Sequence, residues 1–548
     1  MSSTGRGSRG GSESFSNSDS RPPEGIRRQI TSDRTKSGLI LFLVLASYSP
    51  SLFCGFIWDD DAGIVENPDL RSLSGLREIW ANPWKTPQGH YQPLVYSSFW
   101  LEYQLWGLRP VGYHLVNVLL HAANAILLWG LLRRIGLHGA WPAAALFAVH
   151  PVNAESVVWI IERKNVLSGL FFLLCLRSYI RFAERRTPGA YHWALFFFCC
   201  ALLAKISVIT LPAVLLLGLW RGENRLGWKA VGPVLPLGVI GLVFGWFEVR
   251  LAQAHEVTDH GLSIADRVLT AGRAFWFYLG KWVCPVDLAA VYPKWEIDPR
   301  VVWNWIAPLA ALILGAVLWR VRKRVGSGPF CAWAYVLVTL SPTLGFVDFG
   351  FMALAYIADR FLYLPSMGLA ALSGAAIRGA ERKIGRASTA ALLSALLVVP
   401  LSVLTWRQAW TYRNQETLVR HNLENYPEAW LVRYNFAIDL AASGRIEGAI
   451  EHYRGVIKTR PSFIDARNNL GTLLARAGKA EEAEREFEEI LKIDPGYAKA
   501  RFNLGVLAAR RGDREKAAGH YRGVLELDPG NEEAKRLLAE LMAGGERE

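Results

Sequence analysis

The sequence predicts an all-α protein, with a polytopic bundle of about eleven membrane-spanning helices followed by an α-solenoid of tetratricopeptide repeats. Two observations carry this prediction. Of the 548 residues, 51% are hydrophobic, which is too apolar for an ordinary soluble protein of this length. Apolar runs recur through residues 38–410, whereas residues 428–548 repeat a fixed pattern every 34 positions.

The positive charge of the chain lies in its apolar part. Residues 428–548 carry 20 Lys and Arg against 21 Asp and Glu, so their net charge is 20 − 21 = −1. Residues 1–427 carry the other 41 basic and 27 acidic residues, a net charge of 41 − 27 = +14. Basic residues of a membrane protein gather beside its spans. The charge therefore does not indicate a nucleic-acid partner, and we expect none.

The chain begins with a polar stretch. Residues 1–37 are rich in Ser, Gly, Arg and Pro and contain almost no large apolar side chain, which predicts a disordered cytoplasmic N-terminus. The polar stretch is long, and no small-residue cleavage site follows the apolar run, so it does not resemble a cleavable signal. We expect the first span, at 38–57, to remain as an anchor.

Ten further apolar runs follow, each close to the ~20 residues that a helix needs to cross a bilayer. They lie at 112–132, 140–160, 165–182, 190–204, 206–220, 230–250, 301–319, 329–347, 361–378 and 388–405. The two runs on either side of Lys205 are short, so the count is ten or eleven. Residues 263–285 have mixed polarity, which favours an interfacial or re-entrant helix over a full span.

The distribution of basic residues predicts the orientation of the bundle. Alternate connectors, such as "LLRRIG" (131–136) and "RVRKRVG" (320–326), are basic and therefore cytoplasmic. The other connectors hold most of the acids and include two large outer loops, 58–110 and 251–300. The membrane domain then covers 38–410 and a linker covers 411–427. With eleven spans, the repeats lie outside the cytoplasm.

The tail contains three tetratricopeptide repeats and a capping helix. Pro427, Pro461, Pro495 and Pro529 lie 34 residues apart. The same spacing separates Asn435, Asn469 and Asn503; Gly444, Gly478 and Gly512; Ala449, Ala483 and Ala517; and Tyr453, Phe487 and Tyr521. In each helix–turn–helix unit, Gly allows a turn with positive φ, the small Ala permits close helix approach and Pro ends the second helix. We expect the concave groove of the repeats to hold a protein or peptide.

Several polar residues should gather at the outer side of the bundle, where polar groups within spans need a partner or a function. Asp59, Asp60 and Asp61 follow the first span. His114, Asn117 and His121 share one face of the second span by their helical spacing. Further candidates come from later outer ends, namely His150, Glu155, Arg163, Lys164, Lys205, Arg360 and Tyr363.

Each of these signals also has an ordinary structural explanation. The aspartates can be solvated loop residues, the histidines can be hydrogen-bonded packing residues, Arg360 can extend to the interface, and Lys205 can mark the end of a span. Their convergence on one side favours a site, because a plain linker does not require polar stripes on the neighbouring helices.

This arrangement suits transfer of a group from a lipid phosphate. The donor phosphate needs cations, for which Arg163, Lys164, Lys205 and Arg360 are candidates, with Tyr363 beside them. The acceptor hydroxyl needs a carboxylate base, which the aspartate triplet can supply. The sequence contains no Walker loop, HExxH motif or nucleophile elbow.

The first outer loop has two membrane features. Leu73, Leu76, Ile79 and Trp80 have the spacing of an amphipathic helix lying on the bilayer. The aromatic residues of "HYQPLVYSSFWLEYQLWG" suit the headgroup region and can also stack on a sugar. Tyr91 belongs to this stretch and is a candidate for the substrate pocket, together with His114, Asn117, His121, His150 and Glu155.

Four stretches, in this order and ahead of the repeats, resemble the transmembrane and tetratricopeptide repeat-containing (TMTC-type) proteins and their bacterial relatives. They are "FIWDDDAGIVENPDL", "YQPLVYSSFWLEYQLWGLRPVGYHLVNVLLHAANA", "LFAVHPVNAESVVWIIERKNVLSGLFFL" and "DRFLYLPSMG". The similarity covers nearly everything after residue 37. The family is similar in architecture to the GT-C glycosyltransferases, which take a sugar from a polyprenyl phosphate.

The resemblance implies a chemistry and a set of roles. Better-known members transfer mannose to Ser or Thr of proteins on the lumenal side, so the implied donor is a polyprenyl-phosphate-linked sugar. An acidic residue of the first outer loop acts as the base or lies beside the acceptor, which matches Asp59 and Asp60, while Asp61 has no assigned role. Relatives often read "YRPL" where this chain has Gln92, which places more weight on Arg163 and Arg360 as phosphate contacts.

The prediction is therefore a membrane glycosyltransferase that moves a mannose-like hexose to a hydroxyl, with protein Ser or Thr as acceptor. The alternative is a non-catalytic membrane anchor that presents the repeats as a scaffold for envelope assembly. A transporter or flippase predicts inverted repeats or broken spans, which the sequence does not show clearly. Asp59, Asp60 and Asp61 can hold a divalent metal if one is bound, although such donors often need none. The high ratio of Arg to Lys favours a bacterial inner membrane, with a periplasmic active side.

Overall fold

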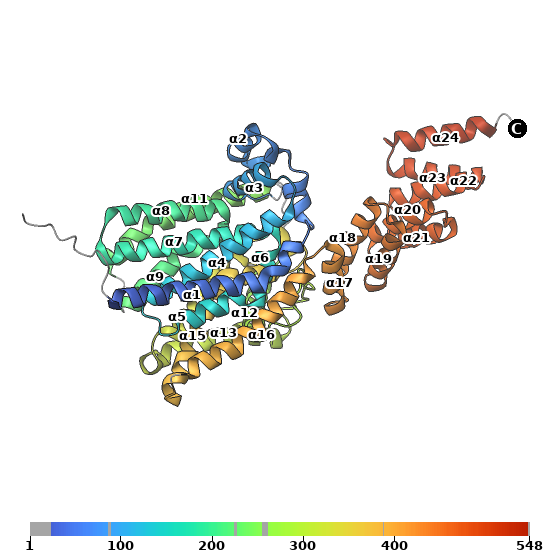
Figure 1. The fold of residues 1–548 in the computed structure, drawn as a ribbon. Helices are drawn as coiled ribbons and strands as arrows, with labels where there is room; N and C mark the ends of the chain where they lie inside the picture. Colours follow the sequence, from blue (N-terminus) through green and yellow to red (C-terminus); the bar gives the residue numbers. More distant parts are fainter. Residues whose placement is uncertain (1–23, 86–88, 224–226, 255–260, 387, 546–548) are drawn as a thin grey trace, which may run out of the picture.

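The computed structural model describes residues 24–85, 89–223, 227–254, 261–386 and 388–545. These residues form helices, turns and loops and contain no strand. Figure 1 shows a bundle of long helices from which a curved row of short helices extends at one end. The all-α prediction, with a membrane bundle and a helical repeat array, is confirmed.

In the described part of the chain, the bundle is made of sixteen helices joined by short 3-10 and π segments. They are α1 (Glu24–Tyr48), α2 (Leu73–Ala81), α3 (Pro93–Trp106), α4 (Pro110–Arg134), α5 (Ala140–Val149), α6 (Ala154–Val158), α7 (Arg163–Arg185), α8 (Pro188–Ala204), α9 (Leu211–Glu223), α10 (Trp228–Val231), α11 (Leu235–Ala254), α12 (Ile264–Val283), α13 (Ile306–Val325), α14 (Gly328–Leu340), α15 (Tyr363–Ile384) and α16 (Thr389–Thr411).

Seven apolar helical segments in the described part of the chain are long enough to cross a membrane, fewer than the ten or eleven predicted spans. They are Thr31–Phe53, Pro110–Arg134, Ile160–Arg185, Trp228–Ala254, Val302–Val325, Asp359–Ile384 and Thr389–Thr411. Three more predicted runs form shorter apolar helices, at Ala140–Val149, Pro188–Ala204 and Ile206–Arg221. Hydropathy identified the apolar runs, but it did not show that some helices stop well short of the ~20 residues of a full span.

The N-terminal part of α1 differs from the prediction of disorder over 1–37. Residues 1–23 lie outside the described part of the chain, but α1 begins at Glu24, within the polar stretch. Two contacts hold this helix start to the bundle: Arg133 forms an ion pair with Asp33 at 2.6 Å, and the Trp141 indole donates to the carbonyl of Lys36 at 3.3 Å. The anchoring helix therefore continues into the polar sequence.

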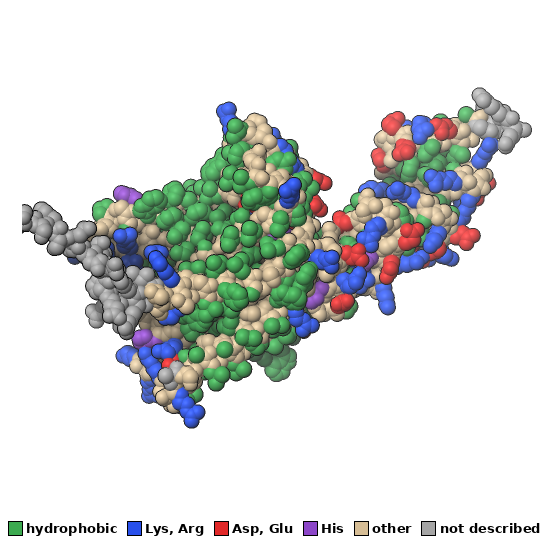
Figure 2. Space-filling model, in the orientation of Figure 1, with side chains coloured by type: hydrophobic (Ala, Val, Ile, Leu, Met, Phe, Trp, Pro, Cys, Tyr) green, Lys and Arg blue, Asp and Glu red, His purple; other side chains and the backbone are tan. Residues whose placement is uncertain are grey.

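The two ends of the bundle differ in charge. Lys and Arg side chains gather at the end where α1 begins, at the left of Figure 2, and an apolar belt covers the flank of the bundle. The last turns of α4, α7, α13 and α15 contribute to the basic end, with Arg133 and Arg134, Arg185, Arg322 to Arg324, and Arg382 and Lys383 respectively. The repeats extend from the opposite end.

The predicted linker at 411–427 contains a helix, α17 (Gln415–Asn425), which packs against the bundle. The Asn422 amide lies across the backbone of Val291, accepting from its N–H at 3.0 Å and donating to its carbonyl at 2.9 Å. Tyr426 donates to the carbonyl of Asp287 at 3.0 Å. Side-chain to backbone hydrogen bonds thus fix this segment to the described part of the second large loop (251–300).

The repeats form three helix pairs and a final helix, as the 34-residue period predicts. These helices are α18 (Trp430–Ala442), α19 (Ile446–Thr459), α20 (Ile464–Arg476), α21 (Ala480–Ile493), α22 (Ala498–Arg510), α23 (Arg514–Leu527) and α24 (Glu532–Gly545). The turn glycines Gly444, Gly478 and Gly512 all have positive φ, at 77°, 78° and 82°. A side chain at Gly471 would lie 2.7 Å from the Phe487 ring, so close helix approach requires glycine there.

Two amphipathic helices lie outside the set of long apolar segments. The predicted interfacial helix is α2, whose Leu73 is 73% exposed and whose Trp80 is 43% exposed. The segment predicted at 263–285 is α12, which packs against α13 and begins with a capping box between Ser263 and Asp266. The mixed polarity of both segments matches these partly exposed positions.

Candidate active site

The three aspartates after the first span point in different directions. Asp60 is fully buried, and its carboxylate accepts the backbone N–H of Ile57 at 3.0 Å and that of Ile161 at 2.8 Å. Asp59 and Asp61 are exposed. Burial raises the pKa of Asp60 well above its ordinary value, the two backbone donors oppose this rise, and the neighbouring aspartates add to it. Asp60 therefore fixes the loop, and Asp59 faces outward beside it.

The chain turns sharply just before the triplet. Trp58 has a φ of 46°, in the left-handed region that a bulky residue seldom adopts. Its ring packs edge to face on Trp159, with centroids 5.5 Å apart. Trp159 precedes the short helix η6 (Ile160–Glu162), which contains the N–H that binds Asp60. A strained turn, an aromatic pair and a buried carboxylate together place the aspartates against η6.

Arg360 anchors a cluster of charged side chains beside this turn. Its Nη1 donates to Glu155 Oε1 at 2.5 Å, its backbone N–H donates to the other oxygen of Glu155 at 2.7 Å, and its Nε lies 3.5 Å from Glu162 Oε1. The guanidinium also lies over the Phe351 ring, 4.1 Å from its centroid. Both glutamates are buried, so Arg360 balances charges that water cannot reach.

Lys164 and Lys205 complete this cluster. Lys164 Nζ lies 3.1 Å from Glu162 Oε1, and Asn165 donates to the same carboxylate at 2.6 Å. Lys205 Nζ donates to Asn165 Oδ1 at 2.5 Å. We call the group Glu155, Glu162, Lys164, Asn165, Lys205 and Arg360 the cationic cluster. It holds three cations against two carboxylates.

Burial lowers the pKa of Lys205 to about 8. Glu162 acts in the opposite direction and favours the charged lysine, whereas Lys164 and Arg360 lower the pKa further. A bound anion in the cluster would offset the repulsion among the three cations.

The exposed aspartate and the cationic cluster share one region. The charge of Asp59 acts on the Arg360 guanidinium, and the Arg360 guanidinium lies 5.6 Å from the centroid of Trp159, the ring on which Trp58 packs. The turn after η1 (Ser49–Phe53) thus brings the exposed Asp59 carboxylate within electrostatic reach of Arg360, just before α15. The sequence predicted that Asp59, Lys164, Lys205 and Arg360 converge on one site. Lys164, Lys205 and Arg360 meet through Glu162 and Asn165, and the role of Asp59 stays a prediction.

Arg163 points away from this cluster, although it directly precedes Lys164. It is fully buried, forms an ion pair with Glu102 and donates to Asn117 at 2.7 Å, to the Tyr113 carbonyl at 2.8 Å and to Ser98 at 3.2 Å. Burial raises the pKa of Glu102, and Arg163 opposes that rise. Arg163 thus connects α3, α4 and α7, and its donors already have partners within the protein.

The polar stripe on α4 lies in the interior of the bundle. Asn117 donates to the carbonyls of Trp159 and Ile160 at 3.4 Å. The His121 ring contacts the Tyr363 hydroxyl at 2.9 Å and the Ala148 carbonyl at 3.0 Å. His114 is likewise buried, at 2% exposure. Asn117 and His121 thus bond to neighbouring segments of the bundle, which matches the packing explanation of their spacing.

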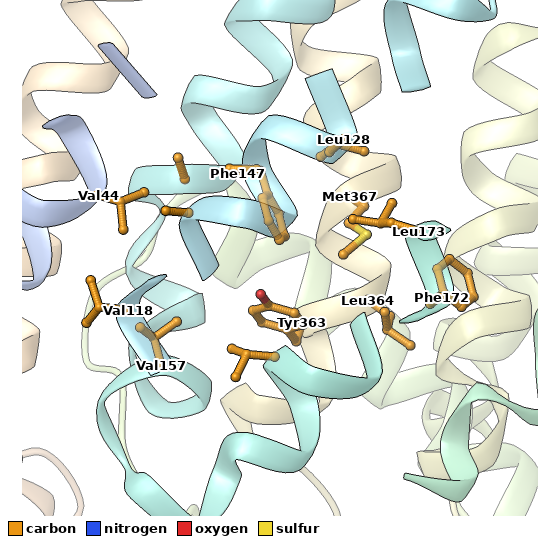
Figure 3. Packing of buried hydrophobic residues seen from close by; sticks show 14 of the residues in the cluster. Val44, Val118, Leu128, Phe147, Val157, Phe172, Leu173, Tyr363, Leu364 and Met367 are labelled. Atoms are coloured by element: carbon orange, nitrogen blue, oxygen red, sulfur yellow. The ribbon is translucent and has the colours of Figure 1, made fainter. Parts of the chain in front are cut away.

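Tyr363, predicted beside the donor phosphate, is also buried. Figure 3 shows its ring below Phe147, between Val157 and Leu364. Its hydroxyl accepts from Asn124 at 2.9 Å in addition to its contact with His121. Residues 360–363 thus lead from the cationic cluster, which contains Arg360, into the hydrophobic core, which contains Tyr363.

Two further predicted pocket residues lie apart from the cationic cluster. His150 stacks on Trp282 with centroids 4.0 Å apart, and its Nε2 is 2.9 Å from the carbonyl of Trp282. Tyr91 donates to the carbonyl of Trp80 at 2.9 Å, and its backbone N–H donates to Glu248 at 3.2 Å. Both have partners in other parts of the bundle.

Glu162 was not predicted as a site residue, although it contacts two of the cations. The signal was present in the sequence, because it stands directly before Arg163 and Lys164 at the outer end of a predicted span, where an acid needs a partner. The described residues contain no group of three or more His, Cys, Asp or Glu side chains that could hold a metal ion. Asp60 belongs to the aspartate triplet that the sequence offered as ligands if a metal is bound. Its buried carboxylate already accepts two backbone N–H groups.

Known proteins match this chain in two ways: a family model matches the repeats, and curated relatives match most of the chain. Residues 434–498 and 473–532 match the tetratricopeptide repeat family. Human protein O-mannosyl-transferase TMTC1 is 28% identical over 492 residues, covering 78% of this chain and 55% of the relative. Mouse protein O-mannosyl-transferase TMTC4 is 27% identical over 492 residues, with coverages of 75% and 65%. The curated homologues are TMTC-family protein O-mannosyl-transferases. The resemblance found from the motifs is thereby confirmed.

The match to these TMTC-family proteins is partial on their side. The chain spans between 52% and 65% of the length of TMTC1, TMTC4 and mouse TMTC3. Among solved structures, the first tetratricopeptide domain of Spaghetti (RPAP3) bound to an HSP90 peptide is 24% identical, covering 21% of this chain and 91% of that chain with a TM-score of 0.21. MamA is 17% identical, covering 29% and 90%, with a TM-score of 0.20.

Proposed function

We propose that this protein is a GT-C-type membrane glycosyltransferase that moves a hexose, mannose in the first instance, from a polyprenyl phosphate to a hydroxyl group of a protein. The single observation that carries the proposal is the exposed carboxylate of Asp59, whose charge acts on Arg360 of the cationic cluster. The names of the curated homologues, protein O-mannosyl-transferases, support the same reaction class.

In this proposal Asp59 is the base. It takes the proton of the acceptor hydroxyl, whose oxygen forms a bond to the anomeric carbon of the sugar. The bond from that carbon to the phosphate oxygen breaks, and the polyprenyl phosphate leaves with the electron pair. The displacement inverts the anomeric centre. Asp60 holds the loop and takes no proton.

The cationic cluster would bind the donor phosphate and stabilise it as it leaves. A phosphodiester carries one negative charge, which matches the excess of one cation over the carboxylates of the cluster. On reaction, the leaving phosphate gains a negative charge while Asp59 is neutralised by the acceptor proton. The total charge of the site is then unchanged, which limits the electrostatic cost of the step.

We place the polyprenyl tail against the apolar flank of the bundle and the acceptor on the side of the repeats. Basic residues gather at the opposite end of the bundle, which favours a cytoplasmic N-terminus and an extracytoplasmic site. The repeats extend from the end that would then be periplasmic in a bacterial inner membrane. Their groove would present the acceptor segment to Asp59.

The test is a transfer assay with the full chain in lipid nanodiscs, a radiolabelled polyprenyl-phosphate hexose panel and Ser/Thr-rich peptides. We expect the wild type to consume one donor of the panel and to release polyprenyl phosphate. Lys205→Gln should raise the donor KM about tenfold or more, because it removes one charge-assisted contact to the phosphate. Lys229→Gln, an exposed lysine of α10, is the matched control and should match the wild type. If no donor is consumed under any condition, the scaffold function replaces this proposal.

A further inference from the structure

A cavity lies at the end of the bundle where α1 begins, far along the bundle from the cationic cluster. It is open to the surface and has a volume of about 710 Å³ between α1, α4, α5, α15 and α16. Three cations line it, Lys36, Arg133 and Arg378, with His138 beside them. The proposed glycosyl transfer uses none of these residues.

The inner part of this cavity is an apolar groove along two helices. Leu39 and Leu43 lie four residues apart on α1 and form one wall. Ala391, Ala395 and Val399 lie four residues apart on α16, are exposed, and form the other wall. Small side chains on one helix thus lie opposite larger ones on the other, and the apolar groove between them follows the two helices.

The mouth of the cavity is polar and basic. Arg133 pairs with Asp33 at 2.6 Å and lies 5.1 Å from the Trp129 ring centroid, and Arg378 pairs with Glu381. Neither of these acids lines the cavity, and its described lining contains no Asp or Glu. Lys36 stands one turn before Leu39, so a cation and the apolar wall follow one another on the same helix face.

A tight helix contact gives this cavity a rigid side. At the start of α5, a side chain on Gly139 would lie 2.1 Å from the carbonyl oxygen of Gly374 on α15. Trp141, two residues later, lines the cavity and donates to the carbonyl of Lys36. The backbones of α5 and α15 therefore touch directly, and α1 is bonded to the same corner.

We propose that this cavity binds an anionic phospholipid, with its phosphate among Lys36, Arg133 and Arg378 and one acyl chain in the groove between α1 and α16. Basic pockets between spans with a tryptophan at the interface are suited to anionic headgroups. A zwitterionic headgroup would bring its own ammonium to a mouth that is already net positive, with Lys36, Arg133 and Arg378 against Asp33 and Glu381. A free phosphate ester would leave the apolar groove unused.

Native mass spectrometry of the detergent-purified full chain tests this site. The ligands are phosphatidylglycerol, phosphatidylcholine, glycerol phosphate and polyprenyl phosphate. The first variant, Lys36→Gln, removes an exposed cation of the mouth, and Lys323→Gln, exposed in the last turn of α13, is its control. The second, Ala395→Phe, fills the groove, and Leu396→Phe, on the same helix outside the cavity lining, is its control.

We expect one phosphatidylglycerol to be retained by the wild type and by both controls. Lys36→Gln should weaken its binding about fivefold, since one basic residue near an anionic headgroup contributes about 1 kcal/mol. Ala395→Phe should abolish the adduct while the unfolding temperature without lipid stays within the range of the controls. Equal binding of phosphatidylcholine, equal competition by glycerol phosphate, a preference for polyprenyl phosphate, or binding unchanged by both variants would each overturn the proposal. Transfer activity is not the readout, so this result is independent of the proposed function.

Discussion

The carboxylate of Asp60 accepts the backbone N–H of Ile161 at 2.8 Å, joining segments 101 residues apart in the sequence. Its other oxygen accepts the N–H of Ile57 at 3.0 Å. The loop after the first span is thereby tied to the segment that enters the cationic cluster at Glu162. Because Asp60 is buried and Asp59 is exposed, the two neighbouring acids separate into a positioning residue and a candidate base.

Asp59→Asn and Asp60→Asn should therefore have different effects, the first on catalysis and the second on stability. We expect Asp59→Asn to lower kcat at least a hundredfold, as the loss of a general base does, with an unchanged unfolding temperature. Asp60→Asn keeps only one acceptor oxygen for two buried N–H groups, which should cost about 1–3 kcal/mol of stability. Thermal unfolding in detergent and single-turnover transfer separate the two effects. An Asp59→Asn protein with wild-type kcat would remove Asp59 from the mechanism.

Donor binding should weaken at alkaline pH because Lys205 loses its charge. Burial lowers the pKa of Lys205 to about 8, so the free protein carries the charge below that pH and loses it above. The donor KM should therefore rise between about pH 7 and about pH 9.5, where an ordinary lysine would still be charged. In Lys205→Arg the guanidinium stays charged, and the rise should disappear. The same rise in Lys205→Arg would assign it to another group.

Arg163→Lys is expected to destabilise the protein without affecting donor binding. A lysine cannot reproduce the contacts of Arg163 with Glu102, Asn117, Ser98 and the Tyr113 carbonyl, so at least one buried partner is left unpaired, at a cost of about 1–3 kcal/mol. Thermal unfolding measures this loss. Arg177→Lys, an exposed position on the same helix, is the control. A raised donor KM with unchanged stability would instead indicate that Arg163 contacts the phosphate.

The sequence was sufficient to predict the helical architecture and the repeats, whereas the site stays a prediction. The 34-residue period and the apolar runs are local patterns of the sequence. In the structure they correspond to the paired helices of the repeats and to the apolar helices of the bundle. The sequence could not separate Asp59 from Asp60, or Lys164 from Arg163, because adjacent residues differ only in which way the local turn points them. That direction is set by distant partners, Ile161 for Asp60 and Glu102 for Arg163.

The same limit explains the histidines and tyrosine of the predicted pocket. The spacing of His114, Asn117 and His121 correctly indicated a shared polar face on α4. It could not show that Tyr363 and the Ala148 carbonyl, far away in sequence, face His121 and leave it in the interior. Polar residues within spans require partners, and those of Asn117 and His121 belong to neighbouring segments of the bundle.

Asn422→Ala should loosen the repeats from the bundle. The change removes both hydrogen bonds to the Val291 backbone and leaves a buried N–H and carbonyl without a partner, which should cost about 1–3 kcal/mol for each. We expect faster limited proteolysis between residues 411 and 427 while the cleaved repeats remain folded. Glu424→Ala, at an exposed position on the same helix, should leave the cleavage rate unchanged. Equal protease resistance in both variants would show that other contacts hold this joint.

Gly374→Ala should disrupt the packing of α15 against α5. A methyl group at Gly374 would lie 2.4 Å from the carbonyl oxygen of Gly139 and 2.7 Å from the Ala143 side chain, so the helices must separate. Overpacking of this kind costs about 1–3 kcal/mol. Gly379→Ala is the matched control, since it lies on the same helix with nothing within 4 Å. Its higher helix propensity should leave stability equal or improved by up to about 1 kcal/mol. Thermal unfolding of both variants measures this difference. Equal unfolding temperatures would mean that α5 and α15 can move apart to fit the methyl group without a loss of stability.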